Sequence, residues 1–389
     1  MVALPPEARQ QELEAAQAAL LERLRRDIDY IRMQVEQPFI RQSIAVTNTT
    51  SDGIPEYLRL RMEEARKDDD TYDQYVRDAV MHNHHAHRFK LQMDSPFASL
   101  PTLCRRFTLI ELLGVSSSGI EVWKAMDLHL TKDVTLKVSA DTHMITYDYK
   151  ALAKIDVHDA VVGMSRDGLL HDTFQGQRYS MYALQFMQDD LQSILHRRRD
   201  GRLPPVVAHA VAFQVAKCIQ HLCIDARVAH CDLRPSNILV TRPWNVAVTN
   251  FKSSRSRREL LPTIPHHKVK EMDASSVLYA APETFNCLEA LGNTVTCDAT
   301  DVWALGVLYF VMLYGHHPLA PGLVVLDDAM KLPFVEHLRK YDGTVVFPAT
   351  PVVPPIVQRV IQACLHRDPS QRMPSDSLVT SGFFPAVVN

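Results

Sequence analysis

The chain has 389 residues, of which 46% are apolar and 22% are charged, and its formal net charge is −3 at pH 7. This length suits one two-lobed domain of about 250–300 residues with an appendage. The small net charge excludes nucleic-acid binding through the overall charge. We predict no membrane span and no secretory signal, because neither a long apolar run nor a basic N-terminal cap occurs.

The seven cysteines are scattered along the chain, and no Cys-x-x-Cys pair occurs among them. An odd number without such spacing predicts neither a disulfide framework nor a structural zinc site. We therefore expect a reducing compartment, either the nucleus or the cytoplasm.

Residues 1–46 are predicted to form an N-terminal helix, because good helix formers dominate positions 7–36. A short heptad seam runs along this helix, and it consists of Leu21, Leu24, Ile28, Ile31 and Val35. Two interpretations stay open. The helix either docks on its own protein or forms a short coiled coil through which residues 13–35 self-associate.

Residues 47–103 are predicted to be a linker and a charged helical segment, which ends near Phe89. Four histidines at positions 82–87 suggest a metal site. They have no cysteine or acidic partner at ligand spacing, so a solvated helix end is the better interpretation. From position 104 the chain changes to short β-type runs, and after about Pro205 to long helical stretches. Strands followed by helices are typical of an α+β fold.

The strongest motif is HCDLRPSNILV at residues 230–240, which AVTNFK follows at 247–252. Phosphoryl transfer to a hydroxyl needs a carboxylate that accepts the proton and an amide oxygen that helps to hold magnesium. Asp232 and Asn237 have the spacing with which the protein-kinase catalytic loop supplies these groups. Arg234 stands where kinases carry a lysine. These three are the predicted catalytic residues of the loop.

Further kinase motifs follow in the correct order. Lys137 in VTLKV stands where the third-strand lysine contacts nucleotide phosphates, and we count it among the catalytic residues. Glu283 closes an A-P-E triplet, Asp301 begins an apolar helix, and Arg372 is placed to form an ion pair with Glu283. Together these motifs predict a bilobal protein-kinase fold over residues 104–385, with a small β-rich N-lobe (104–187) and a large α-helical C-lobe (188–385).

ATP is the nucleotide that this fold predicts. The predicted ATP site lies between the glycine-rich loop, the strands behind it, the hinge and the segment after the catalytic loop. The predicted ATP-binding residues are Gly114, Ser116, Ser117, Gly119, Val122, Lys137, Leu184, Gln185, Met187 and Lys252.

Several of these positions depart from the kinase pattern. The loop reads GVSSSGIEV, so one glycine that lets backbone amides approach phosphate is missing. No glutamate stands where one should pair with Lys137. The best-placed acid is Asp148, which is one methylene shorter, so either its helix is drawn inward or Lys137 is held loosely. Cys231 replaces an arginine that commonly clamps a phosphorylated activation loop.

The largest departure from the kinase pattern is at the metal-binding position. Asn250-Phe251-Lys252 stands in place of D-F-G, so a neutral amide oxygen replaces the carboxylate that holds magnesium. Asn237 and Asn250 are the predicted metal ligands, and Mg²⁺ is a doubtful cofactor. Lys252 brings a cation to a position normally held by glycine, where it could contact phosphate in the absence of a metal.

The chain resembles the Tousled-like protein kinases in PTLCRRFTLIELLG, EVWKAMDL and DVWALGVLYFVMLYGHHPL, and more weakly in the charged EYLRLRMEEARKDDD. The resemblance covers about residues 101–385 clearly and about 54–100 weakly. It implies the bilobal kinase fold, a nuclear serine/threonine kinase that acts on histone chaperones, and oligomerisation through a coiled coil.

Catalytic residues are changed here, while the residues that hold the fold together are retained, and this combination is typical of a pseudokinase. We therefore predict that the chain acts as a scaffold or allosteric partner of another protein. Two alternatives stay open. One is an active serine/threonine kinase that transfers the γ-phosphate of ATP to a protein substrate. The other is a nucleotide-regulated switch that does not turn ATP over. We predict no membrane association and no specific nucleic-acid binding.

Overall fold

The computed structural model describes residues 92–380, apart from positions 93, 99, 101, 117, 175, 242–243, 258, 260, 286–296 and 321–328. The predicted N-terminal helix, its self-association segment 13–35 and the histidines at 82–87 lie outside the described residues. Those assignments therefore stay predictions.

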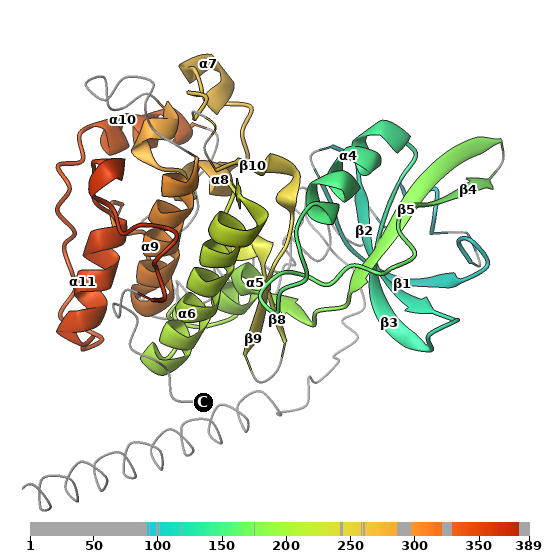
Figure 1. The fold of residues 1–389 in the computed structure, drawn as a ribbon, viewed down its shortest axis with the longest axis horizontal. Coiled ribbons are helices and arrows are strands. Elements are labelled where there is room, and N and C mark those ends of the chain that lie inside the picture. Colours follow the sequence, from blue (N-terminus) through green and yellow to red (C-terminus); the bar gives the residue numbers. More distant parts are fainter. Residues whose placement is uncertain are drawn as a thin grey trace, which may run out of the picture. The chain divides into compact units, whose positions relative to one another are not determined.

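The N-lobe is built on one antiparallel sheet with the strand order β1-β2-β3-β5-β4. Helix α4 packs against this sheet (Figure 1). The elements are β1 (Phe107–Val115), β2 (Glu121–Asp127), β3 (Lys132–Ser139), α4 (Thr142–Ala153), β4 (Leu170–Phe174) and β5 (Gln177–Gln185). Asp141 caps α4, because its side chain accepts hydrogen bonds from the first free backbone N–H groups of the helix.

The core of the N-lobe extends upstream of the boundary at residue 104. Phe97 and Leu103 are buried in the same cluster as Phe107 and Trp123. The ring of Phe97 packs edge-on against Tyr179 with centroids 5.3 Å apart. Phe97 and Leu103, which fall within the predicted linker and charged segment 47–103, are therefore part of the N-lobe core.

The C-lobe is mainly helical, and α6 and α9 lie side by side in it (Figure 1). Its α-helices are α5 (Leu191–His196), α6 (Pro205–His221), α7 (His266–Val269), α8 (Ala274–Tyr279), α9 (Asp298–Tyr314), α10 (Lys331–Arg339) and α11 (Pro355–Cys364). Its short strands are β6 (Asp189–Asp190), β7 (Val228–Ala229), β8 (Ile238–Thr241), β9 (Asn245–Val248) and β10 (Arg255–Ser256). Almost all residues of α9 are buried, so this helix is the centre of the lobe. The α+β bilobal prediction is confirmed.

Among the described residues, one segment is long and apolar enough to cross a membrane by length and composition, namely Pro205–Ala226. It comprises α6 and the π-helical turn η1 (Leu222–Ala226). More than half of it is buried within the protein. Its apolar composition is that of a core helix in the C-lobe.

The predicted ion pair between Arg372 and Glu283 is formed and buried. Arg372 Nη1 lies 2.5 Å from Glu283 Oε1, and Nη2 lies 2.7 Å from Oε2. Nη1 also donates to the carbonyl of Ala299 in the first turn of α9, at 2.9 Å. The guanidinium stacks over the ring of Trp303. The pair therefore ties the end of the activation segment to α9.

Replacing Arg372 by methionine should lower the free energy of unfolding by about 3–5 kcal/mol, because Glu283 is left as a buried unpaired charge. Urea unfolding measures this loss. The matched control is Arg359→Met, since Arg359 is exposed on α11, and surface changes are usually within about 0.5 kcal/mol. Equal stability of the two variants would contradict the assignment.

His317 is a buried neutral histidine just after α9. Its Nε2 donates to the carbonyl of Leu278 at 3.0 Å, and its Nδ1 accepts from the backbone N–H of Leu319 at 3.1 Å. These partners fix the tautomer, because a carbonyl only accepts and an amide N–H only donates. Burial lowers the pKa of His317 to about 3.

Acidification should therefore destabilise the fold. The unfolded chain binds a proton at His317 near pH 6.5, and the folded chain binds it only near the lowered pKa, so stability falls as the pH falls between these values. His317 contributes a slope of at most about 1.4 kcal/mol per pH unit. Urea unfolding from pH 7.5 to 5 should show a smaller slope for His317→Gln. The exposed control His129→Gln should keep the slope of the wild type, and equal slopes in all three proteins would refute the assignment.

Candidate functional site

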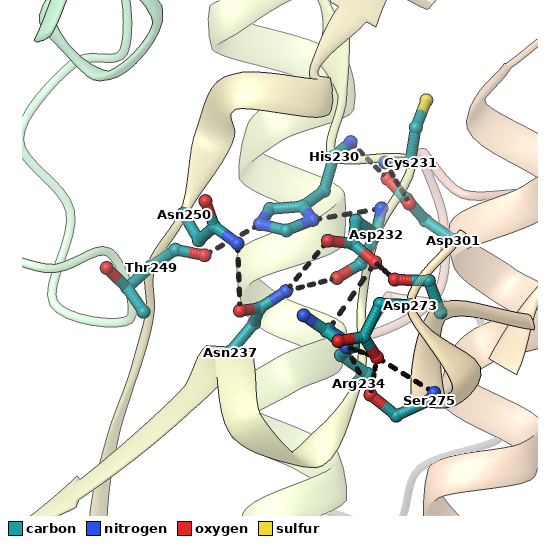
Figure 2. A network of polar contacts seen from close by, with 11 residues as sticks. His230, Cys231, Asp232, Arg234, Asn237, Thr249, Asn250, Asp273, Ser275 and Asp301 are labelled. Carbon is teal, nitrogen blue, oxygen red and sulfur yellow. Dashed lines mark hydrogen bonds and ion pairs between the residues drawn. The ribbon is translucent and has the colours of Figure 1, made fainter. Parts of the chain in front are cut away.

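The side chain of Asp301, on α9, holds the catalytic loop by its backbone. Asp301 accepts the backbone N–H of His230 on Oδ2 at 2.6 Å and that of Cys231 on Oδ1 at 2.8 Å (Figure 2). Burial raises the pKa of Asp301 to about 7, while these two hydrogen bonds favour the ionised form. The His230 ring completes the anchor, because Nε2 donates to the carbonyl of Thr249 and Nδ1 accepts the N–H of Asp232. The loop is thereby held from two sides.

Asp232, the predicted base, is surrounded by polar partners. Its Oδ1 accepts from the Ser276 hydroxyl of α8 at 2.9 Å, and its Oδ2 accepts from Asn237 Nδ2 at 3.2 Å. The same Nδ2 donates to the backbone carbonyl of Asp232 at 2.7 Å. The structure therefore brings Asp232 and Asn237 together, as their spacing predicted.

Arg234 is turned toward the activation segment. Its Nη1 lies 2.5 Å from Asp273 Oδ1 and also contacts the Ser275 hydroxyl (Figure 2). Asp273 is at the same time the N-cap of α8. Arg234 Nε lies 3.6 Å from Asp232 Oδ1, which adds a weaker ion pair. A contact of Arg234 with phosphate stays a prediction, since the guanidinium here links the catalytic loop to α8.

Three partners of these groups were missed in the sequence, namely Ser276, Asp273 and Ser275. No catalytic motif contains them, and they stand about forty residues after the loop that they contact. Their one signal is local, because an aspartate shortly before an apolar run, here in Asp-Ala-Ser-Ser, is typical of a helix N-cap.

Lys137 forms an ion pair with Asp148, the acid predicted to take the place of the missing glutamate. Its Nζ lies 2.7 Å from Asp148 Oδ2, and both side chains are largely buried. The hydroxyl of Tyr182 donates to the same Oδ2 at 2.5 Å. Helix α4 is therefore drawn inward, and the alternative of a loosely held lysine is not what the structure shows.

The register of the sheet places Tyr182 beside the Lys137–Asp148 ion pair. Tyr182 of β5 lies directly opposite Lys137 of β3, so the two side chains share one face of the sheet. Asp148 approaches that face from α4. A neutral hydroxyl partner stabilises the carboxylate without adding charge, and it compensates for the shorter aspartate. Burial and the neighbouring carboxylate raise the pKa of Tyr182 well above its usual value.

The two residues predicted to hold the metal bind each other instead. Asn250 Nδ2 donates to Asn237 Oδ1 at 3.1 Å (Figure 2). Asn250 adopts a left-handed backbone with φ 67°, which asparagine tolerates better than most residues. The oxygen that Asn237 would offer to a cation is thus already an acceptor. In the described part of the chain, no group of three or more His, Cys, Asp or Glu residues could hold a metal ion.

This donor set does not fit Mg²⁺. Magnesium prefers oxygen ligands in a near-octahedral arrangement and is usually bound through one or two carboxylates. Here the two designated ligands are neutral amides, and Asp232 is the carboxylate beside them. Asn237 Oδ1 already accepts one hydrogen bond, which leaves one lone pair of a neutral oxygen for a cation.

The loop between β1 and β2 is closed by its own serines. The Ser116 hydroxyl hydrogen-bonds that of Ser118 at 2.9 Å and accepts the N–H of Ile120 at 3.1 Å. Gly119 has φ 72°, so this glycine is required for the turn. Ser117 lies outside the described residues, and phosphate contacts of Gly114, Ser116 and Gly119 stay predictions.

The other predicted ATP-binding residues fall on neighbouring elements. Val122 of β2 lies opposite Lys137, and Leu184 of β5 lies opposite Thr135, two residues before Lys137 on the same strand. Leu184 and Met187 are buried, whereas Gln185 is exposed. Lys252 lies in the short 3-10 segment η3 (Phe251–Ser253). The register therefore places Val122, Lys137 and Leu184 on one face of the sheet.

Comparison with known proteins agrees with this geometry. The family described as "Protein kinase domain" matches residues 107–384. Serine/threonine-protein kinase PknA of Mycobacterium tuberculosis is 27% identical over 279 residues, which are 70% of this chain and 59% of that protein.

Similarity to Tousled-like kinases is present at lower identity. Serine/threonine-protein kinase tousled-like 1 of Homo sapiens is 22% identical over 352 residues, which are 84% of this chain and 44% of that protein. The tousled-like 1-B protein of Danio rerio is 23% identical over the same length. The chain thus spans about half the length of the curated relatives it matches.

Removing the Tyr182 hydroxyl should destabilise the protein, because it leaves a buried carboxylate with one hydrogen bond fewer. Tyr182→Phe should lower the free energy of unfolding in urea by about 1.5–3 kcal/mol, the range for hydrogen bonds to charged groups. Tyr179→Phe is the matched control, as Tyr179 is also buried in β5 but contacts Phe97. If both variants lose the same amount, Tyr182 does not support Asp148.

Proposed function

This chain belongs to the protein kinase family, and on that premise we propose that it is a pseudokinase that acts through contacts with a protein partner. The observation that carries the proposal is the hydrogen bond between Asn250 and Asn237. It joins two neutral amides at the positions where phosphoryl transfer needs magnesium ligands. The fold is kept, and the charge that the reaction requires is missing.

The physical argument concerns the metal. In kinases Mg²⁺ bridges the β- and γ-phosphates and neutralises the charge that develops during transfer. An amide oxygen carries no formal charge, so it replaces the hydration shell of this cation poorly. Without that neutralisation, Asp232 could still accept a hydroxyl proton, but the leaving group would remain unstabilised.

Nucleotide binding is the part of the kinase function that the site supports best. Lys137 Nζ lies 2.7 Å from Asp148 Oδ2, and the Tyr182 hydroxyl donates to the same oxygen at 2.5 Å, so the three side chains form one cluster. Lysine is a point charge that suits phosphate oxygens. Bound ATP would supply a polyphosphate for Lys137 and an adenine for the face formed by Val122 and Leu184. We propose weak binding, because the loop serines are hydrogen-bonded among themselves.

The partner is proposed to be a protein. The relatives are named as serine/threonine-protein kinases, which supports a protein as the partner or substrate. The nucleus is proposed as the location from the sequence resemblance to Tousled-like kinases alone. The heptad seam in residues 13–35 supports self-association. An intact scaffold, with Arg372, Glu283 and Asp301 all in place, supports a role that depends on shape.

A second candidate is an active serine/threonine kinase. It is favoured by the position of Asp232, which Ser276 and Asn237 hold in place, and by the inward position of α4. In this function Asp232 would accept the proton of a protein Ser or Thr hydroxyl. A third candidate, a nucleotide-regulated switch, draws on the cation of Lys252 beside the metal position.

Restoring the missing carboxylate should create a response to magnesium. We expect ATP to raise the thermal midpoint of the wild type equally with and without Mg²⁺, and to raise that of Asn250→Asp more with Mg²⁺. Saturation at a hundred times the dissociation constant stabilises a protein by about 2.7 kcal/mol. Asn245→Asp is the matched control, because Asn245 is exposed at the start of β9.

A shift of the wild type that requires Mg²⁺ would contradict the proposal and favour the active kinase. A metal-independent shift that Lys252→Ala abolishes would favour the switch. The absence of any shift would remove ATP from the proposal and leave the scaffold role alone.

A further inference from the structure

Two histidines that are distant in the sequence stack face to face outside the candidate site. His158 lies in the connection between α4 and β4, and His221 is the last residue of α6. Their ring centroids are 4.3 Å apart, and the two ring planes differ by 11°. His221 is buried, and His158 is half-buried. The stacked pair therefore joins the segment that follows α4 to a core helix of the C-lobe.

A backbone hydrogen bond requires His158 to be neutral. The N–H of Ala160 donates to His158 Nδ1 at 3.1 Å. An amide N–H only donates, so Nδ1 carries a lone pair, whereas a protonated imidazole has two N–H groups and no acceptor. A proton on this nitrogen of His158 therefore breaks the bond and leaves the N–H of the buried residue Ala160 without its partner.

The second ring offers no better place for a proton. His221 Nδ1 donates to Asp225 Oδ2 at 2.8 Å, because a carboxylate only accepts. Asp225 is exposed in the π-helical turn η1. The other nitrogen, His221 Nε2, is buried and has no hydrogen-bond partner among the described residues. Neither ring thus gains a hydrogen bond from an added proton in this arrangement.

The charged and titratable groups around His158 come from three segments. Lys217 and His221 belong to α6, Asp225 belongs to η1, and Asp159 is the next residue of its own loop. The neighbouring strand β9 carries no charged side chain. Burial, His221 and Lys217 lower the pKa of His158, and the two aspartates oppose this shift. The surroundings therefore favour the neutral ring, in agreement with the hydrogen bond.

The connection that carries the stacked ring also pairs with β9. The N–H of Val162 donates to the carbonyl of Val248 at 2.9 Å, and the N–H of Val248 donates to the carbonyl of Ala160 at 2.8 Å. Val248 is the last residue of β9, two positions before Asn250. At the other end of the connection, α4 carries Asp148 and packs against η3. The connection thus links the two sides of the candidate site.

We propose that His158 and His221 form a proton-sensitive latch, which holds the connection between α4 and β4 on α6 and β9 while His158 is neutral and releases it when His158 is protonated. In the released connection His158 has the ordinary pKa of 6.5, and in the latched form its pKa is lower. The latched form therefore binds fewer protons, and it loses stability as the pH falls below about 6.5. The inference does not depend on whether ATP binds.

The test follows amide hydrogen exchange of the purified full chain by mass spectrometry at about pH 7.5 and about pH 5.5, corrected for the intrinsic pH dependence of exchange. Peptides that cover residues 156–162 and 245–249 should exchange up to about tenfold faster at the lower pH, because release is linked to one proton at the ordinary pKa of 6.5. A peptide from α9 reports global unfolding, and it should stay more protected than these two at both pH values. This comparison needs no variant.

The matched variant is His158→Asn, because the asparagine Oδ1 can accept the N–H of Ala160 as Nδ1 does, and it takes up no proton. In this variant the acceleration of both peptides at low pH should disappear. The control is His129→Asn, since His129 is exposed in the turn after β2, and this variant should keep the acceleration.

Three outcomes would overturn the inference. The two peptides could exchange equally at both pH values, they could exchange no faster than the peptide from α9, or His158→Asn could keep the acceleration of the wild type. The second outcome would mean that the connection opens only when the whole fold opens.

Discussion

The carboxylate of Asp301 is the constraint on which the rest of the site depends. It accepts two successive backbone N–H groups of the catalytic loop, and it belongs to α9, whose residues are almost all buried. Arg372 fixes the same helical turn through Ala299 while it pairs with Glu283. The loop, the activation segment and α9 are therefore one mechanical unit, and Asp232 takes its position from that unit.

On this scaffold the residues that position the catalytic side chains are kept, whereas the charged metal ligand of the D-F-G position is replaced by a neutral amide. Asp148 is shorter than glutamate, yet the Lys137 ion pair forms because Tyr182 lies opposite Lys137 in the sheet. At the metal position no such compensation exists. Asn250 donates one hydrogen bond to Asn237, and neither side chain brings a charge for a cation. In the proposed function, the chain keeps the kinase fold while it lacks the charge that magnesium needs at this position.

The sequence predicted those contacts of the site whose two partners lie in recognised motifs. Asp232 and Asn237 are five residues apart on one loop, so their spacing revealed their contact, and the Glu283–Arg372 pair followed from motif order. Tyr182 and Ser276 belong to no motif, and their partners come from other elements. Two interpretations of α4 stayed open, since one methylene in Asp148 does not decide how far a helix moves. The packing of Tyr182 against that carboxylate decides it.

The most direct test of this account is the transfer of labelled phosphate from ATP and Mg²⁺ to serine- and threonine-containing proteins and to the chain itself. The account predicts that the wild type and Asp232→Asn give the same background, because in the proposed function the metal position does not support the reaction. Incorporation by the wild type that disappears in Asp232→Asn would show that the site is catalytic, and it would contradict the account.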